Sequence, residues 1–249
     1  AIDMCTVSYL PISEHQFILT SNRDEAPNRA AAEIVAEDRY GKALLYPRDP
    51  QANGSWIVLS DTRQLVCILN GAFEKHKHRP PYRLSRGIMA LEFFSFDNAS
   101  HFFENYIFEG IEPFTMLIYD QGTLYDARWD EQMLLVEEKN PAHPHLWSSC
   151  TLYDNMWQQK RRRWFYDWQD HNKVYTQEAI LDFHHNAGEG NPAYDVIMNR
   201  NDEVRTTSIS SAQLEADRFT FRFEDLQSAE VRHESLAIQT VGTGRTQTR

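Results

Sequence analysis

Two short runs of mostly apolar residues open the chain and predict a β-hairpin. Residues 5–10 and 16–21 have the β-branched and aromatic composition of strands, the first run alternates in part between apolar and polar positions, and a short turn separates them. Because the strands of a hairpin are antiparallel, the end of the second run is expected beside the start of the first. The pattern therefore predicts that the polar cluster Asn22-Arg23-Asp24 lies close to Cys5.

Later apolar runs predict further strands. Residues 56–60 and 64–69 are almost continuously apolar, as central strands buried on both faces are, and a short polar turn separates them. Residues 114–119 and 123–129 flank the turn sequence Asp-Gln-Gly, which is typical of a hairpin. Additional strands are expected at residues 133–136, 146–148, 194–198, 203–211 and 218–223.

Apolar residues at spacings of three or four predict helices in the middle of the chain. These helices are expected at residues 82–94, 97–106, 151–168 and 177–184, with Asp97 and Thr176 as candidate N-caps. Residues 26–52 contain several prolines and charges and predict a long, loop-rich connection. Strands at both ends of the chain with helices between them favour one α+β domain, in which the helices cover an antiparallel core.

The boundaries of this domain are expected at residues 4 and 238, without an internal repeat or linker. Met4 directly precedes a small residue and is interpreted as the initiator, so residues 1–3 are expected to be a remnant of expression. Residues 239–249 are rich in Gly, Thr and Arg and predict a flexible tail. A single domain over residues 4–238 is therefore expected.

Charge and cysteine content exclude several classes of protein. The 249 residues include 25 basic and 36 acidic side chains, a net charge of -11, which argues against a nucleic-acid partner held by general electrostatics. Cys5, Cys67 and Cys150 give no disulfide framework and favour a reducing compartment. No apolar run approaches the ~18 residues of a transmembrane helix, and no secretory signal is visible. A cytoplasmic protein is therefore expected.

Cys5 is the strongest candidate for chemistry. If an aminopeptidase that trims Met before small residues makes Cys5 N-terminal, its thiol and a free α-amine share one residue. An α-amine titrates near ~8 and can act as a base, while a thiol with a pKa of about 8.5 is acidified by a nearby Arg. Nucleophile and base together indicate covalent acyl transfer. The alternative is a small apolar residue on a buried strand, the usual place of a free cysteine.

Short motifs carry a family resemblance. Met4-Cys5 is followed by Ser21-Asn22-Arg23-Asp24-Glu25, and then by Asn53-Gly54-Ser55-Trp56, Leu69-Asn70-Gly71, Ser85-Arg86-Gly87 and Arg205-Thr206-Thr207-Ser208. In this order they resemble the NRDE family, also called the TANGO2-like family. That family resembles the N-terminal-nucleophile (Ntn) hydrolases, especially the penicillin acylase and bile-salt hydrolase branch. The resemblance implies a four-layer αββα sandwich with mostly antiparallel sheets.

The resemblance also implies catalytic roles for four residues. Cys5 would be the nucleophile, and Asp24 would hold its α-amine. Asn70 would donate a hydrogen bond to the oxyanion, and Arg205 would favour the thiolate. From the residues themselves, simpler readings stay open. Asp24 could satisfy the backbone of a turn, Asn70 could belong to an ordinary Asn-Gly turn, and Arg205 could be a surface arginine.

Substrate contacts are implied for three further residues. Asn22 and Arg23 belong to the polar cluster beside Cys5, and Ser149 stands where the related hydrolases have a second Asn. The related hydrolases carry their Arg one position before the Asn, where this chain has Ser21. Arg86 has the simpler reading of a residue at a helix start or in a salt bridge.

Two function classes follow. The first is an Ntn-type cysteine amidohydrolase or acyltransferase that acts on a small acylated amine or amide. The alternative is a non-catalytic ligand-binding or trafficking protein on the same fold, with acyl-CoA, a lipid or haem as its ligand. In both classes the expected partner is a small molecule, and a homodimer stays open.

No cofactor and no metal ion are expected. The histidine pairs at residues 76/78, 143/145 and 184/185 have no carboxylate or cysteine at helical ligand spacing. No Walker-type or dinucleotide-binding glycine loop occurs. The basic run at residues 160–163 lies among tryptophans at helical spacing and predicts the solvated face of a helix, not a nucleic-acid site.

Overall fold

A computed structural model describes residues 4–29, 33–149 and 155–239. Within these residues the strands form two seven-stranded sheets, and all of the strand pairs are antiparallel. The first sheet has the order β10 (His145–Ser148), β1 (Met4–Ser13), β2 (Gln16–Glu25), β12 (Val204–Leu214), β13 (Arg218–Asp225) and β14 (Glu230–Ala237), with β11 (Asn199–Arg200) paired to β12. The second has the order β3 (Glu33–Arg39), β4 (Lys42–Arg48), β5 (Ile57–Ser60), β6 (Gln64–Asn70), β7 (Phe114–Asp120), β8 (Thr123–Trp129) and β9 (Leu134–Lys139).

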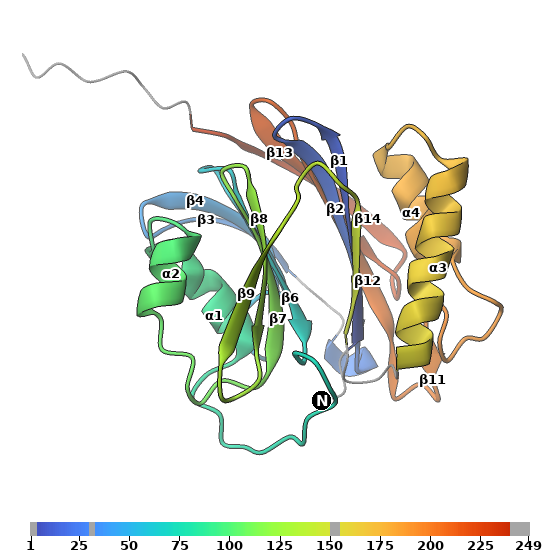
Figure 1. The fold of residues 1–249 in the computed structure, drawn as a ribbon, viewed down its shortest axis with the longest axis horizontal. Helices are drawn as coiled ribbons and strands as arrows, with labels where there is room; N and C mark the ends of the chain where they lie inside the picture. Colours follow the sequence, from blue (N-terminus) through green and yellow to red (C-terminus); the bar gives the residue numbers. More distant parts are fainter. Residues whose placement is uncertain (1–3, 30–32, 150–154, 240–249) are drawn as a thin grey trace, which may run out of the picture.

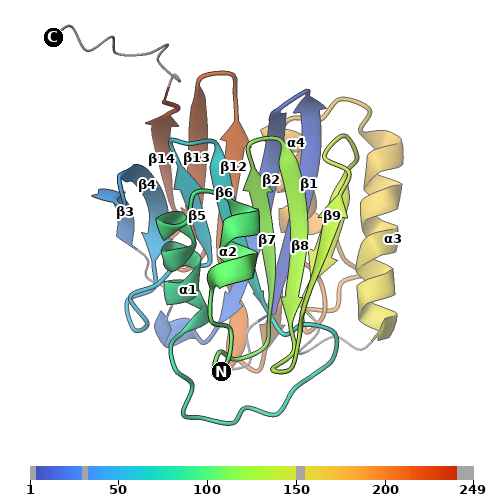
Figure 2. The ribbon, with the colours of Figure 1, turned by 60° about the vertical axis from the view of Figure 1, so that its left-hand side comes forward.

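Helices cover the outer face of each sheet (Figures 1 and 2). The helices α1 (Arg86–Glu92) and α2 (Ala99–Asn105) pack on the second sheet, and α3 (Asn155–His171) and α4 (Gln177–Asn186) pack on the first. Two short 3-10 helices are η1 (Pro27–Arg29) and η2 (Phe93–Ser95). The order of the layers is helix, sheet, sheet, helix, so the predicted four-layer α+β sandwich is confirmed.

The alternation of side chains along β2 shows how these layers are held together. Leu19 is buried between the two sheets together with Leu59 and Leu117. Its neighbour Ile18 lies on the opposite face, in the apolar cluster beneath α3 and α4 that includes Phe165. Successive side chains of a strand point to opposite faces, so a central strand of this sandwich must be apolar on both. This explains the nearly continuous apolar runs in the sequence.

The prediction of a loop at residues 26–52 was wrong for residues 33–48. Two strands, β3 and β4, form a hairpin there, with Tyr40 and Gly41 at positive φ values of 56° and 76°. Two such residues make the tight turn that matches the twist of a hairpin. β3 is an edge strand with one buried residue, Val35, so its sequence carries little apolar signal.

Three other predictions about elements need correction. No strand forms at residues 194–198, where the chain turns and the Tyr194 ring stacks on Trp157 at a centroid distance of 4.0 Å. The first helix does not begin at residue 82: Ser85 caps α1, and its Oγ accepts from the Ile88 N–H. The cap of α2 is Asn98 instead of Asp97.

The remaining helices and strands lie within a few residues of their predicted positions, and β11 and β14 are additions. β14 is mostly exposed and rich in charge, which hid it in the sequence. The first residue of the predicted tail, Gln239, donates hydrogen bonds to the backbone and side-chain oxygens of Asp61. Residues 1–3, 150–154 and 240–249 lie outside the described residues, and so does Cys150.

Among the described residues, no helix combines the length and the apolar character needed to cross a membrane.

Candidate active site

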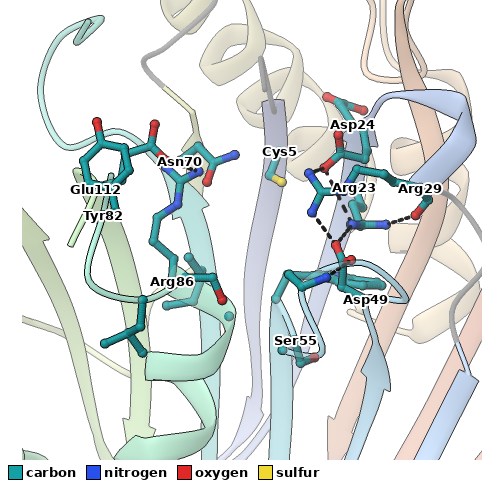
Figure 3. Close-up of a pocket in the computed structure, with 18 residues that line it drawn as sticks. Cys5, Arg23, Asp24, Arg29, Asp49, Ser55, Asn70, Tyr82, Arg86 and Glu112 are labelled. Carbon is teal, nitrogen blue, oxygen red and sulfur yellow. Dashed lines mark hydrogen bonds and ion pairs between the residues drawn. The ribbon is translucent and has the colours of Figure 1, made fainter. Parts of the chain in front are cut away.

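The hairpin of β1 and β2 brings Cys5 to the wall of a cavity. Cys5 pairs with Arg23 and Met4 pairs with Asp24 in the strand register, so the predicted closeness of the polar cluster to Cys5 is confirmed. The cavity has a volume of about 370 Å³ and lies between the two sheets, at the end where β1 begins and β2 and β6 end. Cys5 is 5% exposed and lines this cavity. Its sulfur lies between two groups of polar side chains (Figure 3).

The first polar group is a buried network centred on Asp49. One oxygen, Oδ2, accepts from Arg23 at 2.5 Å and from Arg29 at 2.6 Å, and Arg29 also contacts Glu25 at 2.8 Å. The guanidinium carbon of Arg23 lies 4.2 Å from the centre of the Trp56 ring, within the range of a cation–π contact. Arg23 is therefore fixed on the same side of the sheet as Cys5.

Asp49 is held as a carboxylate. Burial raises the pKa of Asp49, but hydrogen bonds from the Ala52 and Gln51 N–H groups and the charges of Arg23 and Arg29 outweigh burial, so its pKa stays below the usual value. The two backbone bonds are accepted by Oδ1, which leaves Oδ2 for the guanidinium groups. A single side chain thus shapes the loop after β4 and anchors two arginines.

The second polar group lies across the cavity from the first. It consists of Asn70 at the end of β6, Tyr82, and the ion pair of Arg86 with Glu112 at 3.0 Å. Burial raises the pKa of Glu112, but the Arg86 charge and hydrogen bonds from His78 and His76 lower it below its usual value. The wall facing Cys5 is therefore polar, and the opposite charges of Arg86 and Glu112 balance one another there.

Two of the short sequence motifs have a packing role at this cavity. A Cβ on Gly54 would lie 2.3 Å from the Gly87 carbonyl carbon, and a Cβ on Gly87 would lie 2.9 Å from the Ser55 nitrogen. The Ser55 N–H donates to the Gly87 carbonyl at 3.2 Å. The glycines therefore let the loop before β5 touch the start of α1, which closes one side of the cavity.

Asp24 lines the cavity, whereas Asn22 does not. Asp24 is fully buried, and its Oδ1 accepts from the Thr206 hydroxyl at 2.6 Å. The pairing of β2 with β12 shifts register next to Asp24, between Thr206 and Ser208, and such bulges redirect side chains. Asn22 instead faces the helix layer, where its Nδ2 donates to the carbonyls of His184 and Val196. The Asn22 side chain thus points away from the cavity in which a substrate contact was expected.

Ser149 and Arg205 are not among the described residues that line the cavity. The Ser149 hydroxyl donates to the Asn70 carbonyl at 2.6 Å, and its N–H donates to the Cys5 carbonyl at 3.0 Å. Ser149 therefore joins the two sheets behind Cys5. Arg205 lies on β12 opposite Glu25, and β2 separates it from the strand that carries the thiol. Neither side chain is therefore placed at the cavity wall, where the sequence predicted roles for both.

Several cavity residues were not found by sequence reasoning. Arg29, Asp49, Tyr82 and Glu112 lie in loops or at element ends that carried no motif. Arg86 does begin a helix and does form a salt bridge, as expected, but it also lines the cavity. Residues 26–52 were noted for their charges, yet nothing local indicated which of these charges meet.

The second described thiol differs from Cys5. Cys67 is fully buried in the layer between the sheets, and burial raises its pKa to about 12. A thiol in that state is neither accessible nor ionised near neutral pH. In the part of the chain that the structure covers, no group of three or more His, Cys, Asp or Glu side chains could hold a metal ion.

Comparisons with known structures agree with this architecture. A cysteine-to-alanine mutant of the conjugated bile acid hydrolase from Clostridium perfringens is 10% identical, with a TM-score of 0.59 over 95% of this chain and 97% of that chain. An arginine-to-leucine variant of that hydrolase is 9% identical, with a TM-score of 0.58 over 97% and 100% of the two chains. A Caenorhabditis elegans ortholog of N-acylethanolamine-hydrolyzing acid amidase is 13% identical, with a TM-score of 0.49 over 83% and 92%. At these identities the first two similarities establish the fold.

Comparisons of the sequence identify the family. A search of curated proteins finds no match. The model of the family described as Transport and Golgi organisation 2 matches residues 4–185, which confirms the resemblance that the motifs indicated. Because this match spans more than half of the chain, the chain belongs to the Transport and Golgi organisation 2 family, here with the Ntn-hydrolase sandwich as its fold.

Proposed function

We propose that this protein is an Ntn-type cysteine amidohydrolase that acts on a small acylated amine or amide. The observation that carries the proposal is the position of Cys5, whose thiol lines a polar cavity between Asp24 and Arg23 on one side and Asn70 on the other. Similarity in fold to a bile acid hydrolase supports the same reaction class. The proposal requires removal of residues 1–4, so that Cys5 carries a free α-amine.

In the first half of the proposed reaction, the substrate acylates Cys5. The α-amine takes the thiol proton, the sulfur attacks the amide carbon, and the new S–C bond leaves a negative charge on the amide oxygen. The Asn70 side chain donates to that oxygen. The C–N bond then breaks, the leaving amine takes the proton from the α-ammonium, and a thioester remains on Cys5.

Water completes the proposed cycle. The α-amine takes a proton from water, the resulting hydroxide attacks the thioester carbon, and the S–C bond breaks. The thiolate regains its proton, and the carboxylic acid product leaves. Asp24 lies across from Met4 in the strand register, so its carboxylate is suited to hold the α-ammonium that forms once residues 1–4 are gone.

The size and lining of the cavity limit the acyl group. Trp56, Ile68 and Leu84 supply apolar surface on its wall. A volume of about 370 Å³ lies near the lower end of the range of roughly 300–1,000 Å³ for small-molecule sites. We therefore expect short or medium acyl chains to be accepted in preference to long ones.

The test compares trimmed proteins that begin at residue 5. Wild type and the Cys5→Ala variant are incubated with N-octanoylglycinamide, and release of octanoic acid is measured by mass spectrometry. The Cys67→Ala variant is the matched control, because Cys67 is a buried cysteine that does not line the cavity. Turnover by wild type and by Cys67→Ala, with none by Cys5→Ala, is the expected result. Equal turnover by Cys5→Ala and wild type would refute the proposal.

A second arm tests the α-amine. Protein that keeps residues 1–4 has a peptide bond in place of the free amine of Cys5. Loss of the base at a nucleophilic site commonly lowers kcat by ~10² or more. This untrimmed protein should therefore be far slower than the trimmed one, and equal rates would exclude the α-amine as base.

A further inference from the structure

A basic segment borders the cavity in an otherwise acidic protein. Residues 75–86 contain five Lys or Arg residues and no Asp or Glu, whereas the whole chain has a net charge of -11. Lys75, Lys77 and Arg79 are exposed. We call residues 75–79 the basic segment.

The basic segment is attached to the cavity wall at three points. His76 Nε2 lies 3.0 Å and His78 Nδ1 lies 2.8 Å from Glu112 Oε1. The Arg79 N–H donates to the Tyr82 hydroxyl at 2.8 Å. Glu112 and Tyr82 both line the cavity, so these contacts hold the segment against its rim.

The arginines of the cavity wall already have carboxylate partners. Arg23 pairs with Asp49 at 2.5 Å, and Arg86 pairs with Glu112 at 3.0 Å. By contrast, Lys75, Lys77 and Arg79 form no ion pair with any residue that the structure describes. The cations available to a ligand therefore lie on the rim and not in the wall.

We propose that the ligand of this cavity carries an anionic group, a carboxylate or a phosphate, that the basic segment binds at the rim while the acyl part lies beside Cys5. Unpaired cations beside a cavity with low-dielectric walls raise the local concentration of anions. This inference rests on the proposed function for the position of the acyl group, but it requires no turnover. It narrows the substrate class to acylated amines with a negative charge beyond the amide bond.

The first experiment measures the electrostatic potential at Cys5 by alkylation. Iodoacetate is anionic and iodoacetamide is neutral, and with each the thiolate displaces iodide and forms an S–CH2 bond. The modified Cys5 peptide is quantified by mass spectrometry in wild type and in a Lys75→Gln/Lys77→Gln/Arg79→Gln variant. We expect the ratio of the two rates, iodoacetate to iodoacetamide, to fall by about threefold or more in the variant, because unit charges roughly 8 Å apart still interact at physiological salt.

A matched control separates this local effect from a change in net charge. An Arg162→Gln/Arg163→Gln/Lys173→Gln variant removes the same number of charges from exposed positions in α3 and the loop after it. It should keep the wild-type rate ratio, and thermal melting confirms that both variants are folded. An unchanged ratio in the basic-segment variant, or an equal fall in both variants, would overturn the proposal.

The second experiment measures binding without catalysis. Cys5→Ala protein is titrated by calorimetry with N-octanoylglycine, N-octanoyl-O-phosphoethanolamine and the neutral N-octanoylglycinamide. We expect at least one anionic ligand to bind about threefold or more tightly than the neutral one, with a preference that falls in 0.5 M NaCl and in the basic-segment variant. Tighter binding of N-octanoylglycine would indicate a carboxylate site, and tighter binding of N-octanoyl-O-phosphoethanolamine would indicate a phosphate site. No preference for either anion over the neutral amide would contradict the proposal.

These outcomes are independent of the proposed hydrolysis. If the protein prefers anionic ligands but shows no turnover, the proposed hydrolysis is wrong and this inference holds. If it shows turnover but no preference for anions, the proposed hydrolysis holds and this inference is wrong. The rival occupant is an anionic lipid surface. Binding of wild type to phosphatidylserine vesicles that the basic-segment variant loses, together with equal affinity for the anionic and neutral ligands, would assign the segment to a membrane and overturn the proposal.

Discussion

At the scale of single residues, Asp49 does the most to shape the site. One carboxylate accepts two backbone N–H groups and two guanidinium groups, and it is 5% exposed. Arg23 is equally buried, so loss of its partner would leave a charge in a poorly solvated place. Removal of one member of a buried ion pair is far more costly than removal of an exposed one.

We expect Asp49→Asn to lower the free energy of unfolding by about 3 kcal/mol, because Arg23 and Arg29 lose their shared anion. The measurement is urea unfolding at neutral pH. Asp217→Asn is the control, because Asp217 is exposed on a turn and pairs with the exposed Arg218. A cost below about 0.5 kcal/mol for Asp49→Asn would show that the network does not hold the loop.

Gly54 illustrates a requirement set by close contact of two backbones. A Cβ at Gly54 would meet three backbone atoms of residues 87 and 88 at 2.3–2.8 Å, and backbone cannot move aside as a side chain can. At Gly41, by contrast, a Cβ would have nothing within 4 Å, so a larger residue would be strained only by the φ of +76°.

We expect Gly54→Ala to destabilise the protein by about 3 kcal/mol, because it forces the loop before β5 away from α1. Gly41→Ala should lower the free energy of unfolding by about 1 kcal/mol, the usual cost of a left-handed conformation in a residue with a Cβ. Thermal or urea unfolding of both variants measures the difference. A smaller effect at Gly54 than at Gly41 would contradict the packing argument.

At the scale of elements, a buried chain of hydrogen bonds attaches α4 to the first sheet. Asn22 Nδ2 donates to two carbonyls, so its Oδ1 accepts from the Nδ1–H of His184 at 2.7 Å. The Nε2 of His184 then accepts from the Ser8 hydroxyl at 2.7 Å. Burial, with smaller effects of His185 and Arg161, lowers the pKa of His184 to about 3.

This lowered pKa predicts a loss of stability in acid. The pKa in the folded protein lies below the ordinary value of 6.5, so between these values the unfolded chain binds more protons. The contribution of neutral His184 is therefore complete above pH 6.5 and declines as the pH falls toward 3. At 1.36 kcal/mol per pH unit, the loss at pH 5 is about 2 kcal/mol.

Urea unfolding at pH 7.5 and pH 5 measures this contribution. The fall in unfolding free energy between the two pH values should be about 2 kcal/mol smaller in His184→Gln than in wild type. His101→Gln removes a half-exposed histidine and should keep the wild-type fall. Equal falls in all three proteins would show that His184 is not held neutral.

At the scale of the whole molecule, the two sheets share one apolar layer. Leu19, Leu59 and Leu117 are fully buried within it, and they come from both sheets. Ser149 adds polar links between the sheets, through its hydrogen bonds to Cys5 and Asn70. Neither sheet can bury its inner face alone, so the sheets are expected to unfold together.

We expect Leu117→Ala to lower the free energy of unfolding by about 3 kcal/mol, because it opens a cavity in the layer that both sheets share. Unfolding should still occur in a single transition. Unfolding is followed by far-ultraviolet circular dichroism and by tryptophan fluorescence, and the two midpoints should coincide. Leu135→Ala is the control, since Leu135 is half exposed on the edge strand β9. Separate midpoints in Leu117→Ala would mean that the sheets unfold independently.

The sequence by itself determined most of the strands, most of the helices and the surroundings of Cys5. These depend on local signals: apolar alternation sets a strand, and a hairpin fixes which of its residues face one another. For this reason the closeness of the Asn22-Arg23-Asp24 cluster to Cys5 followed from the chain alone, whereas the exact pairs, Cys5 with Arg23 and Met4 with Asp24, came from the structure. The edge strands β3 and β14 were not predicted, because an exposed strand has few apolar residues to form a pattern.

The tertiary structure decided which charges meet and which way polar side chains point. Asp49 joins Arg23 across 26 residues, and Asn22 meets His184 across 162, so no local pattern could indicate either contact. The same holds for Ser149, whose hydroxyl reaches the end of β6 and not the cavity. Side-chain direction depends on which layer packs on each face of a strand, and that is settled only when the four layers assemble.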